Sequence, residues 1–180
     1  MPSEKNRISL QMARDRLAYD PETGRFMWLP RTDNRRDADR WNRQFAGKEA
    51  GSVNMYGYRR VCVEYITVQA HRLAWLFIHG EWPEHEVDHK DRNRDNNSAD
   101  NLRAATRTQN GGNKSMHRNN TSGKKGVSWH KRIGKWSANI RVNDRLKNLG
   151  YFDDLEEASS AYRKAAVEAF GDYATDGEAA

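Results

Sequence analysis

The feature that most constrains this chain is a basic, polar stretch just past its middle. Residues 111–125 are rich in Gly, Asn, Ser and Lys and contain almost nothing that a folded core would bury. Hydrophobic residues make up 36% of the 180 positions, and charged residues make up 31%. Because such a chain cannot build one large core, we expect small modules joined by a basic connection.

The expected organisation has four parts. They are a first domain over residues 1–115 with an N-terminal helix and β-hairpin elements, a basic linker over 116–124, a second domain over 125–173, and a disordered tail over 174–180. The fold class expected from this order of elements is α+β.

The charge balance favours a polyanionic partner. Lys and Arg exceed Asp and Glu, giving a net charge of +6, and they recur along the whole chain. A merely basic protein without such a partner is the alternative that composition leaves open. The single cysteine, Cys62, excludes an internal disulfide, and we expect it to be buried in a strand. No apolar run approaches the roughly 20 residues that span a bilayer, and none resembles a signal peptide, so a cytoplasmic protein without a membrane partner is expected.

Apolar spacing predicts the elements of the first module. Ser9 can cap a short helix whose apolar stripe includes Leu17 and Ala18. The Pro and Gly of residues 19–24 predict a turn, which a strand over 26–29 follows. The remaining elements are a charge-dense loop over 31–43, a small sheet over 47–67 and a helix over 69–79.

The residues with catalytic chemistry gather in the next stretch. A strand over 86–89 carries Asp88 and His89 side by side, and a polar loop follows it. A second strand over 102–105 then leads to a helix that Thr106 can cap. The predicted order is strand, loop, strand, helix.

These residues suit phosphodiester hydrolysis, which needs a base for water and a cation beside the phosphate. Asp88 offers a carboxylate and Asn110 a carbonyl oxygen to a hard cation such as Mg²⁺. His89 can accept a proton at neutral pH, and Asn101, twelve positions later, can accept a hydrogen bond from the other ring nitrogen. Neighbouring strand residues point to opposite faces. Asp88 and His89 therefore share a site only if the strand is irregular or the phosphate lies between them.

The second module is predicted to be a three-stranded antiparallel sheet packed on one helix. Residues 135–142 alternate, so the face with Trp136 is expected to pack on the helix and the opposite face to be polar and basic. The predicted strands cover 127–129, 135–142 and 147–152, and Asp153 or Asp154 caps the helix.

The central stretch resembles the HNH endonuclease motif in its phage and homing-endonuclease form. The matching residues are Asp88-His89, Asn96-Asn97, Asp100-Asn101-Leu102, Thr108-Gln109-Asn110 and, upstream, residues 70–75, within a likeness that covers roughly 17–115. The resemblance implies a ββα-metal (His-Me finger) nuclease core in which His89 is the general base. It implies that Asp88 and Asn110 hold one divalent metal and that Asn101 steadies the loop. The cysteine pairs of zinc-stabilised members are absent and Asn110 replaces a histidine, so Mg²⁺ or Mn²⁺ is expected, with no structural zinc and no small-molecule cofactor.

The second module resembles the AP-two (Apetala, ethylene-response-factor) DNA-binding domain. The matching residues are Lys125-Gly126-Val127, residues 134–141, Leu149-Gly150-Tyr151-Phe152, Glu156-Glu157-Ala158 and Ala161-Tyr162. That family lays its sheet in the DNA major groove. The candidate DNA contacts are Lys125, Ser128, His130, Lys131, Arg132, Lys135, Asn139 and Arg141, with Asn148 as a further one. Arg72 is added because a helix N-terminus attracts phosphate, whereas His71 beside it is expected to be structural.

The two likenesses agree on double-stranded DNA as the partner. They predict a sequence-directed DNA endonuclease of phage or mobile-element homing type, acting as a monomer, with a dimer as the alternative. One catalytic centre per chain favours a nick. A non-cleaving DNA-binding transcriptional regulator is the alternative from another class. An RNA-binding module is disfavoured because the A-form major groove is too narrow for a sheet.

Overall fold

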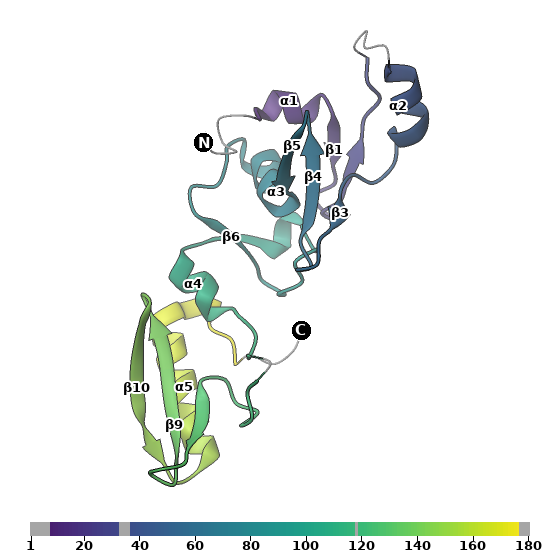
Figure 1. The fold of residues 1–180 in the computed structure, drawn as a ribbon. Coiled ribbons are helices and arrows are strands. Elements are labelled where there is room, and N and C mark those ends of the chain that lie inside the picture. Colours follow the sequence, from purple (N-terminus) through teal and green to yellow (C-terminus); the bar gives the residue numbers. More distant parts are fainter. Residues whose placement is uncertain (1–7, 33–36, 118, 177–180) are drawn as a thin grey trace. The chain divides into compact units, whose positions relative to one another are not determined.

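The computed structural model describes residues 8–32, 37–117 and 119–176. Contacts divide the chain into two compact units, Met1–Ala104 and Ala105–Ala180, and each is described by itself (Figure 1). This division falls earlier than the boundary expected after residue 115. The helix α4 (Arg107–Gly112) belongs with the second unit because Thr108 Oγ1 donates to Asn143 Oδ1 at 2.7 Å and Gly112 lies against the Phe170 ring.

The first unit begins with helix α1 (Leu10–Arg14), and Ser9 caps it as expected by accepting a hydrogen bond from Met12 N at 3.1 Å. The expected apolar stripe is wrong beyond this helix. Leu17 and Ala18 lie in strand β1 (Leu17–Tyr19), which pairs antiparallel with β2 (Phe26–Trp28). Pairing with β2 provides backbone hydrogen bonds that outweigh the helical spacing.

A helix stands where a loop was expected. Helix α2 (Ala38–Phe45) covers the second half of the charge-dense stretch, from residue 38 to its end at residue 43, and residues 33–36 of that stretch lie outside the described residues. Trp41 explains the helix, because its ring packs edge-on against Trp28 at 5.4 Å and against Phe45, one turn on, at 5.4 Å. The many arginines of the stretch favoured the prediction of a loop, and the packing of Trp41 was not foreseen.

The small sheet and the following helix were predicted correctly. Strands β3 (Ser52–Val53), β4 (Arg59–Val63) and β5 (Ile66–Gln69) form an antiparallel sheet in that order, and α3 (Ala70–His79) follows directly. Val61 and Val63 point into the core, so Cys62 between them is exposed and the expected burial of Cys62 is wrong.

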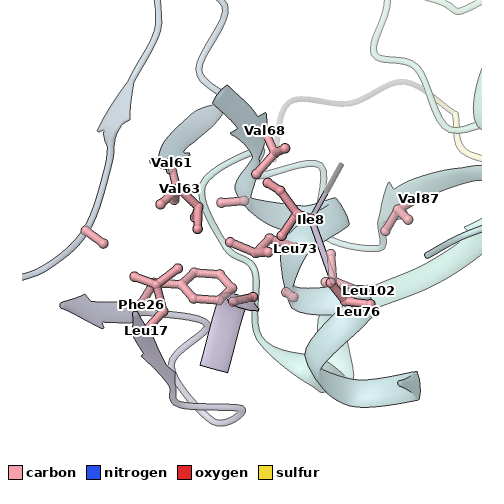
Figure 2. Close-up of a cluster of buried hydrophobic side chains, with 14 residues drawn as sticks. Ile8, Leu17, Phe26, Val61, Val63, Val68, Leu73, Leu76, Val87 and Leu102 are labelled. Atoms are coloured by element: carbon pink, nitrogen blue, oxygen red, sulfur yellow. The ribbon is translucent and has the colours of Figure 1, made fainter. Parts of the chain in front are cut away.

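The core of the first unit joins these elements (Figure 2). Phe26, Leu17 and Ile8 pack with valines of β4 and β5 and with leucines of α3. Val87 and Leu102 complete this cluster from β6 (Glu86–His89) and β7 (Leu102–Ala105), which form a two-stranded sheet. The predicted catalytic stretch therefore rests on the core of the first unit. The loop between β6 and β7 ends in the short 3₁₀ helix η2 (Ala99–Asn101).

The second unit contains α4 and an antiparallel sheet of β8 (Val127–His130), β9 (Lys135–Val142) and β10 (Arg145–Phe152), with β9 in the middle. Helix α5 (Leu155–Phe170) follows, and Asp154 caps it with bonds from Glu156 N and Glu157 N. Val127, Ala138 and Ile140 pack against Tyr162 and other side chains of α5, and Trp136 borders this cluster as expected. The 3₁₀ helix η3 (Gly171–Tyr173) ends the described elements.

Parts of the segments that were expected to be flexible form hydrogen bonds or pack against the core. In the linker, Ser122 Oγ donates to Val127 O at 2.7 Å and Asn120 Oδ1 accepts from Gly123 N at 2.8 Å. In the tail, Ala174 packs against the core of the second unit, while residues 177–180 lie outside the described residues. None of the described helices is long and apolar enough to cross a membrane.

Candidate active site

Asp88 and His89 leave strand β6 on opposite sides. Val87 belongs to the hydrophobic core, and His89, two residues on, shares its side of the strand and contacts His71 of α3. Asp88 points the other way, where Arg103 of β7 binds it. The strand is therefore regular at this pair. A phosphate that engages both side chains has to lie between them, which is one of the two arrangements that the sequence left open.

The imidazole of His89 is buried among other rings. It is 4% exposed, and its ring lies edge-on to His71 at a centroid distance of 5.2 Å, with Tyr58 at 6.3 Å. Burial lowers the pKa of His89, against the opposing effects of a hydrogen bond with Asn97 and of the Asp91 and Asp88 carboxylates. The neutral ring that a proton acceptor requires is thus the favoured form at pH 7.

Asn97 determines which nitrogen of His89 carries the proton. The amide Nδ2 of Asn97 donates to the Asp95 carbonyl at 3.1 Å, so the oxygen Oδ1 is the atom that faces His89 Nε2 at 3.2 Å. An amide oxygen only accepts, so the neutral ring carries its proton on Nε2. The lone pair that can take a proton from water is then on Nδ1.

Asp88 is a buried carboxylate held by one guanidinium. It is 5% exposed, and Arg103 Nε and Nη2 both lie 2.9 Å from Asp88 Oδ2. A charge-assisted contact of this kind offsets much of the cost of burying the carboxylate. Arg103 had no predicted role, because its spacing from Asp88 does not indicate a cross-strand pair before the register of the sheet is known.

Asn101 holds the loop between β6 and β7. Its Oδ1 accepts from Asp91 N at 3.0 Å, and its Nδ2 donates to Asp91 Oδ1 at 2.9 Å and to the Asn96 carbonyl at 2.7 Å. These bonds tie Asn101 to the loop, and the loop-steadying role that the resemblance implied stays a prediction. We expected Asn101 to contact the imidazole, but Asn97 makes this contact, at Nε2. Asn97 was among the residues that match the motif, but its contact with His89 was not predicted.

The predicted metal pair is divided between the two units. Asp88 belongs to the first unit and Asn110, half-buried on α4, to the second. The helix α4 begins with the expected Thr106 cap and forms a full capping box with Gln109. Among the described residues no group of three His, Cys, Asp or Glu side chains is placed to hold a metal ion. One carboxylate and one amide oxygen nevertheless suit Mg²⁺, which usually keeps several waters and takes phosphate oxygens as further ligands.

His71 is structural in its surroundings, as expected. It is 5% exposed, and burial together with the nearby His89 and Arg72 lowers its pKa to about 3. The ring is therefore neutral throughout the physiological range, and it packs against the ring of His89. Arg72 is half-buried in the first turn of α3.

The predicted DNA contacts of the second unit share one face of its sheet. The cross-strand pairs Ser128↔Ser137, His130↔Lys135 and Asn139↔Asn148 place these residues opposite the α5 side, and Arg141 follows in the same alternation. Lys131 and Arg132 are exposed in the turn between β8 and β9. We call this surface the open face; its residues are Ser128, His130, Lys135, Ser137, Asn139, Arg141, Asn148 and Tyr151.

Several candidate contacts have intramolecular partners, among them Lys125 and Lys135. Lys125 Nζ donates to the Gly112 carbonyl at 2.7 Å and to the Thr175 carbonyl at 3.2 Å, so Lys125 holds α4 and the tail. Lys135 forms an exposed ion pair with Asp153 at 2.9 Å. The open face borders a groove of about 760 Å³ whose other walls include Arg107 of α4 and Lys114.

Comparison with known proteins places this site in a family. Residues 68–111, from the end of β5 through α4, match the family model described as HNH endonuclease. Protein 3.8 of Escherichia phage T7 is 33% identical over 100 residues, which cover 55% of this chain and 83% of that protein. The uncharacterized HNH endonuclease L560 of Acanthamoeba polyphaga mimivirus is 36% identical over 111 residues, which cover 59% of this chain and 56% of that protein.

Residues 68–111 therefore form an HNH endonuclease domain. HNH endonucleases act on DNA, generally with a divalent metal, so this domain supports a DNA endonuclease with a ββα-metal core. The chain spans about half the length of the mimivirus relative. No solved structure matches the chain.

Proposed function

We propose that the chain is a sequence-directed DNA endonuclease that hydrolyses one phosphodiester bond per event, with His89 as its general base. The observation that carries the proposal is the neutral, buried imidazole of His89 beside the buried carboxylate of Asp88. Buried titratable groups of opposite function, side by side at the end of a strand, are typical of a catalytic site.

In the proposed reaction His89 Nδ1 takes a proton from the attacking water. The hydrogen bond between Nε2 and Asn97 holds the ring so that Nδ1 keeps its lone pair for this step. The buried His71 ring packs against the His89 ring at a centroid distance of 5.2 Å and supports its orientation. Asn101 keeps the loop after β6 closed by bonding Asp91 and Asn96, so that the end of the strand presents a fixed surface to the phosphate.

Asp88 and Asn110 are the residues we propose as ligands for one divalent cation, Mg²⁺ or Mn²⁺. Both offer oxygen atoms, which these hard cations prefer. When bound there, the cation would supply positive charge to the phosphate and to the leaving oxygen. Arg103, which binds Asp88 Oδ2, adds positive charge on the same side of β6.

We propose the second unit as a DNA-binding domain of the AP-two type that lays its open face in the major groove. The polar open face, the exposed Lys131 and Arg132 and the basic groove beside them support this proposal. Asn139 and Asn148, which are hydrogen-bonded to each other, offer amide groups of the kind that read adenine. The viral relatives support a phage or mobile-element enzyme of homing type.

The test is cleavage of supercoiled plasmid and phage DNA with Mg²⁺ or Mn²⁺ by the full chain. We expect nicked product from the parent, and we expect His89→Ala to reduce the rate by about 10²–10⁴-fold while leaving DNA binding in a gel shift unchanged. The matched control is His85→Ala, because His85 is exposed before β6. An unchanged rate in His89→Ala would contradict the mechanism. DNA that is bound but never cut by the parent would favour the regulator over the nuclease.

A further inference from the structure

A rigid turn lies directly against the loop that carries Asn97. In this turn Asp20 Oδ1 accepts from Glu22 N at 3.0 Å and Asp20 Oδ2 from Thr23 Oγ1 at 2.6 Å. The Asp20 carbonyl also accepts from Gly24 N at 2.8 Å. These bonds close the turn on itself, so its shape does not depend on the loop that it touches.

The turn contacts the loop through backbone atoms on either side of Asn97. Tyr19 Oη donates to the Asn97 carbonyl at 2.8 Å, and the Pro21 carbonyl accepts from Ala99 N at 2.8 Å. Burial, and secondarily the charge of Asp20, raises the pKa of Tyr19 to about 12, so its hydroxyl keeps the proton that it donates.

Gly24 makes the closest approach to Asn97. A Cβ atom at this position would lie 2.2 Å from the Asn97 carbonyl carbon and 2.3 Å from Ser98 N, so only glycine permits the contact. Gly24 also has a φ of +71°, which favours glycine on its own account. The turn therefore packs directly against the backbone of Asn97 and leaves no room for a side chain between them.

The β3–β4 sheet holds the same loop from another direction. Arg59 Nε and Nη2 donate to the two carboxylate oxygens of Asp95 at 2.8 and 3.0 Å, and Arg94 Nη1 donates to the Tyr56 carbonyl at 2.8 Å. Asn97 is 1% exposed, and its amide bridges Asp95 and His89. A displacement of the loop backbone would thus be passed directly to the imidazole.

We propose that Tyr19 and Gly24 are positioning residues for His89 and act through Asn97. Both lie outside residues 68–111, which match the HNH endonuclease model. The inference rests on the proposed role of His89. It adds that the proton-accepting tautomer of His89 is maintained by a turn that lies 65 or more residues earlier in the chain.

The experiment compares two glycine substitutions with the same backbone cost. Gly24 and Gly47 have φ angles of +71° and +74°, but a Cβ at Gly47 would meet no atom within 4 Å. Both alanine variants are strained by the positive φ angle. Only Gly24→Ala also clashes with the backbone of Asn97. Tyr19→Phe is the milder variant because it removes one hydrogen bond to the Asn97 carbonyl, and Tyr65→Phe, at a 90% exposed site, is its control.

Two measurements are made on each full-length variant after circular dichroism has confirmed folding. The first is a long-range ¹H–¹⁵N spectrum of the histidine rings at pH 8, in which the His89 signals are identified by their loss in His89→Gln. The second is the separation of kcat from KM in DNA cleavage. In the parent we expect one protonated and one unprotonated ring nitrogen on His89. In Gly24→Ala we expect the two signals to move toward each other and kcat to fall about tenfold to hundredfold, with KM nearly unchanged.

The outcomes distinguish this inference from the proposed function. The inference is overturned if Gly24→Ala and Tyr19→Phe match their controls in both measurements, or if the parent itself shows averaged nitrogen signals. If Gly24→Ala does not fold, the same two measurements on Tyr19→Phe and its control Tyr65→Phe test the inference. The proposed function fails separately if His89→Ala cuts DNA as fast as the parent. The nitrogen signals then still report whether the turn controls the tautomer.

Discussion

Arg103 donates twice to a single oxygen of Asp88, since both Nε and Nη2 lie 2.9 Å from Oδ2. The carboxylate is deeply buried, with 6% of its side chain exposed against 18% for Arg103. A guanidinium that binds a buried carboxylate in this way balances its negative charge.

The first prediction concerns this pair. Arg103→Met should destabilise the protein by about 3 kcal/mol, because a buried carboxylate is left without its cation. Millimolar Mg²⁺ should restore more stability to the variant than to the parent, since a bound cation replaces the lost charge. Urea unfolding with and without Mg²⁺ measures both effects.

The control for Arg103→Met is the double variant Asp88→Asn with Arg103→Met. It removes both charges together and should be more stable than Arg103→Met alone. Equal stability of the single and double variants would show that the unpaired Asp88 carboxylate does not destabilise the fold.

The second prediction concerns the pH dependence of stability. The folded pKa of His71 is about 3, well below its ordinary value of 6.5, so the unfolded chain binds more protons between these limits. Stability is therefore complete above pH 6.5 and falls as the pH drops toward 3. At pH 5 the loss from His71 alone is about 2 kcal/mol. Burial lowers the pKa of His89 as well, which adds to the effect in the same direction.

His71→Gln tests this assignment. The variant should be less stable than the parent at pH 7.5 but should lose less stability between pH 7.5 and pH 5, as measured by urea unfolding at both values. His85→Gln, at an exposed site, should keep the slope of the parent. An identical slope in His71→Gln and the parent would assign the acid sensitivity to other groups.

The third prediction concerns DNA binding by the open face. Each phosphate contact made by Lys or Arg contributes roughly −0.9 to the slope of log affinity against log salt. Arg141→Ala should therefore make the slope shallower by about one unit if Arg141 binds phosphate, as fluorescence anisotropy at several salt concentrations would report. Lys164→Ala is the matched control, because Lys164 is exposed on α5, behind the sheet. A slope that is the same in all three proteins would contradict this role for Arg141.

The fourth prediction concerns the packing of the second unit. Gly126 and Gly123 have φ angles of +72° and +71°, but a Cβ at Gly126 would lie 2.1 Å from the Tyr162 ring and one at Gly123 would meet nothing within 4 Å. Gly126→Ala should cost about 2 kcal/mol more than Gly123→Ala, because the ring and the β9 backbone have to move. Thermal unfolding of both variants measures the difference, and equal melting temperatures would show that the site relaxes freely.

The sequence predicted the elements that local patterns determine. Helical spacing located α3, alternation located β9, the Thr106 cap was correct, and of the two predicted caps Asp153 and Asp154 it is Asp154 that caps α5. In these segments local preference and tertiary packing favour the same structure. The alternation along β9 also predicted correctly which residues face the core and which lie on the open face, as the cross-strand register shows.

The elements that the sequence missed depend on partners elsewhere in the chain. Helix α2 forms because Trp41 packs on Trp28, and the helix begun at Ser9 stops because Leu17 pairs with Trp28 across a sheet. The roles of Asn97 and Arg103 in the candidate site likewise follow from the folded loop and the strand register. Spacing indicated which residue types gather in the site, but three-dimensional contacts determine which atom meets which.

The contact between Tyr19 and Asn97 has a practical consequence for transplanting the nuclease motif. A fragment excised at residues 68–111 would carry Asp88, His89 and Asn110 into a new host but would leave behind the turn that fixes Asn97 and the Arg59 that binds Asp95. A chimera built on such a fragment needs a substitute for that outside support. The smallest graft that keeps it starts before Tyr19.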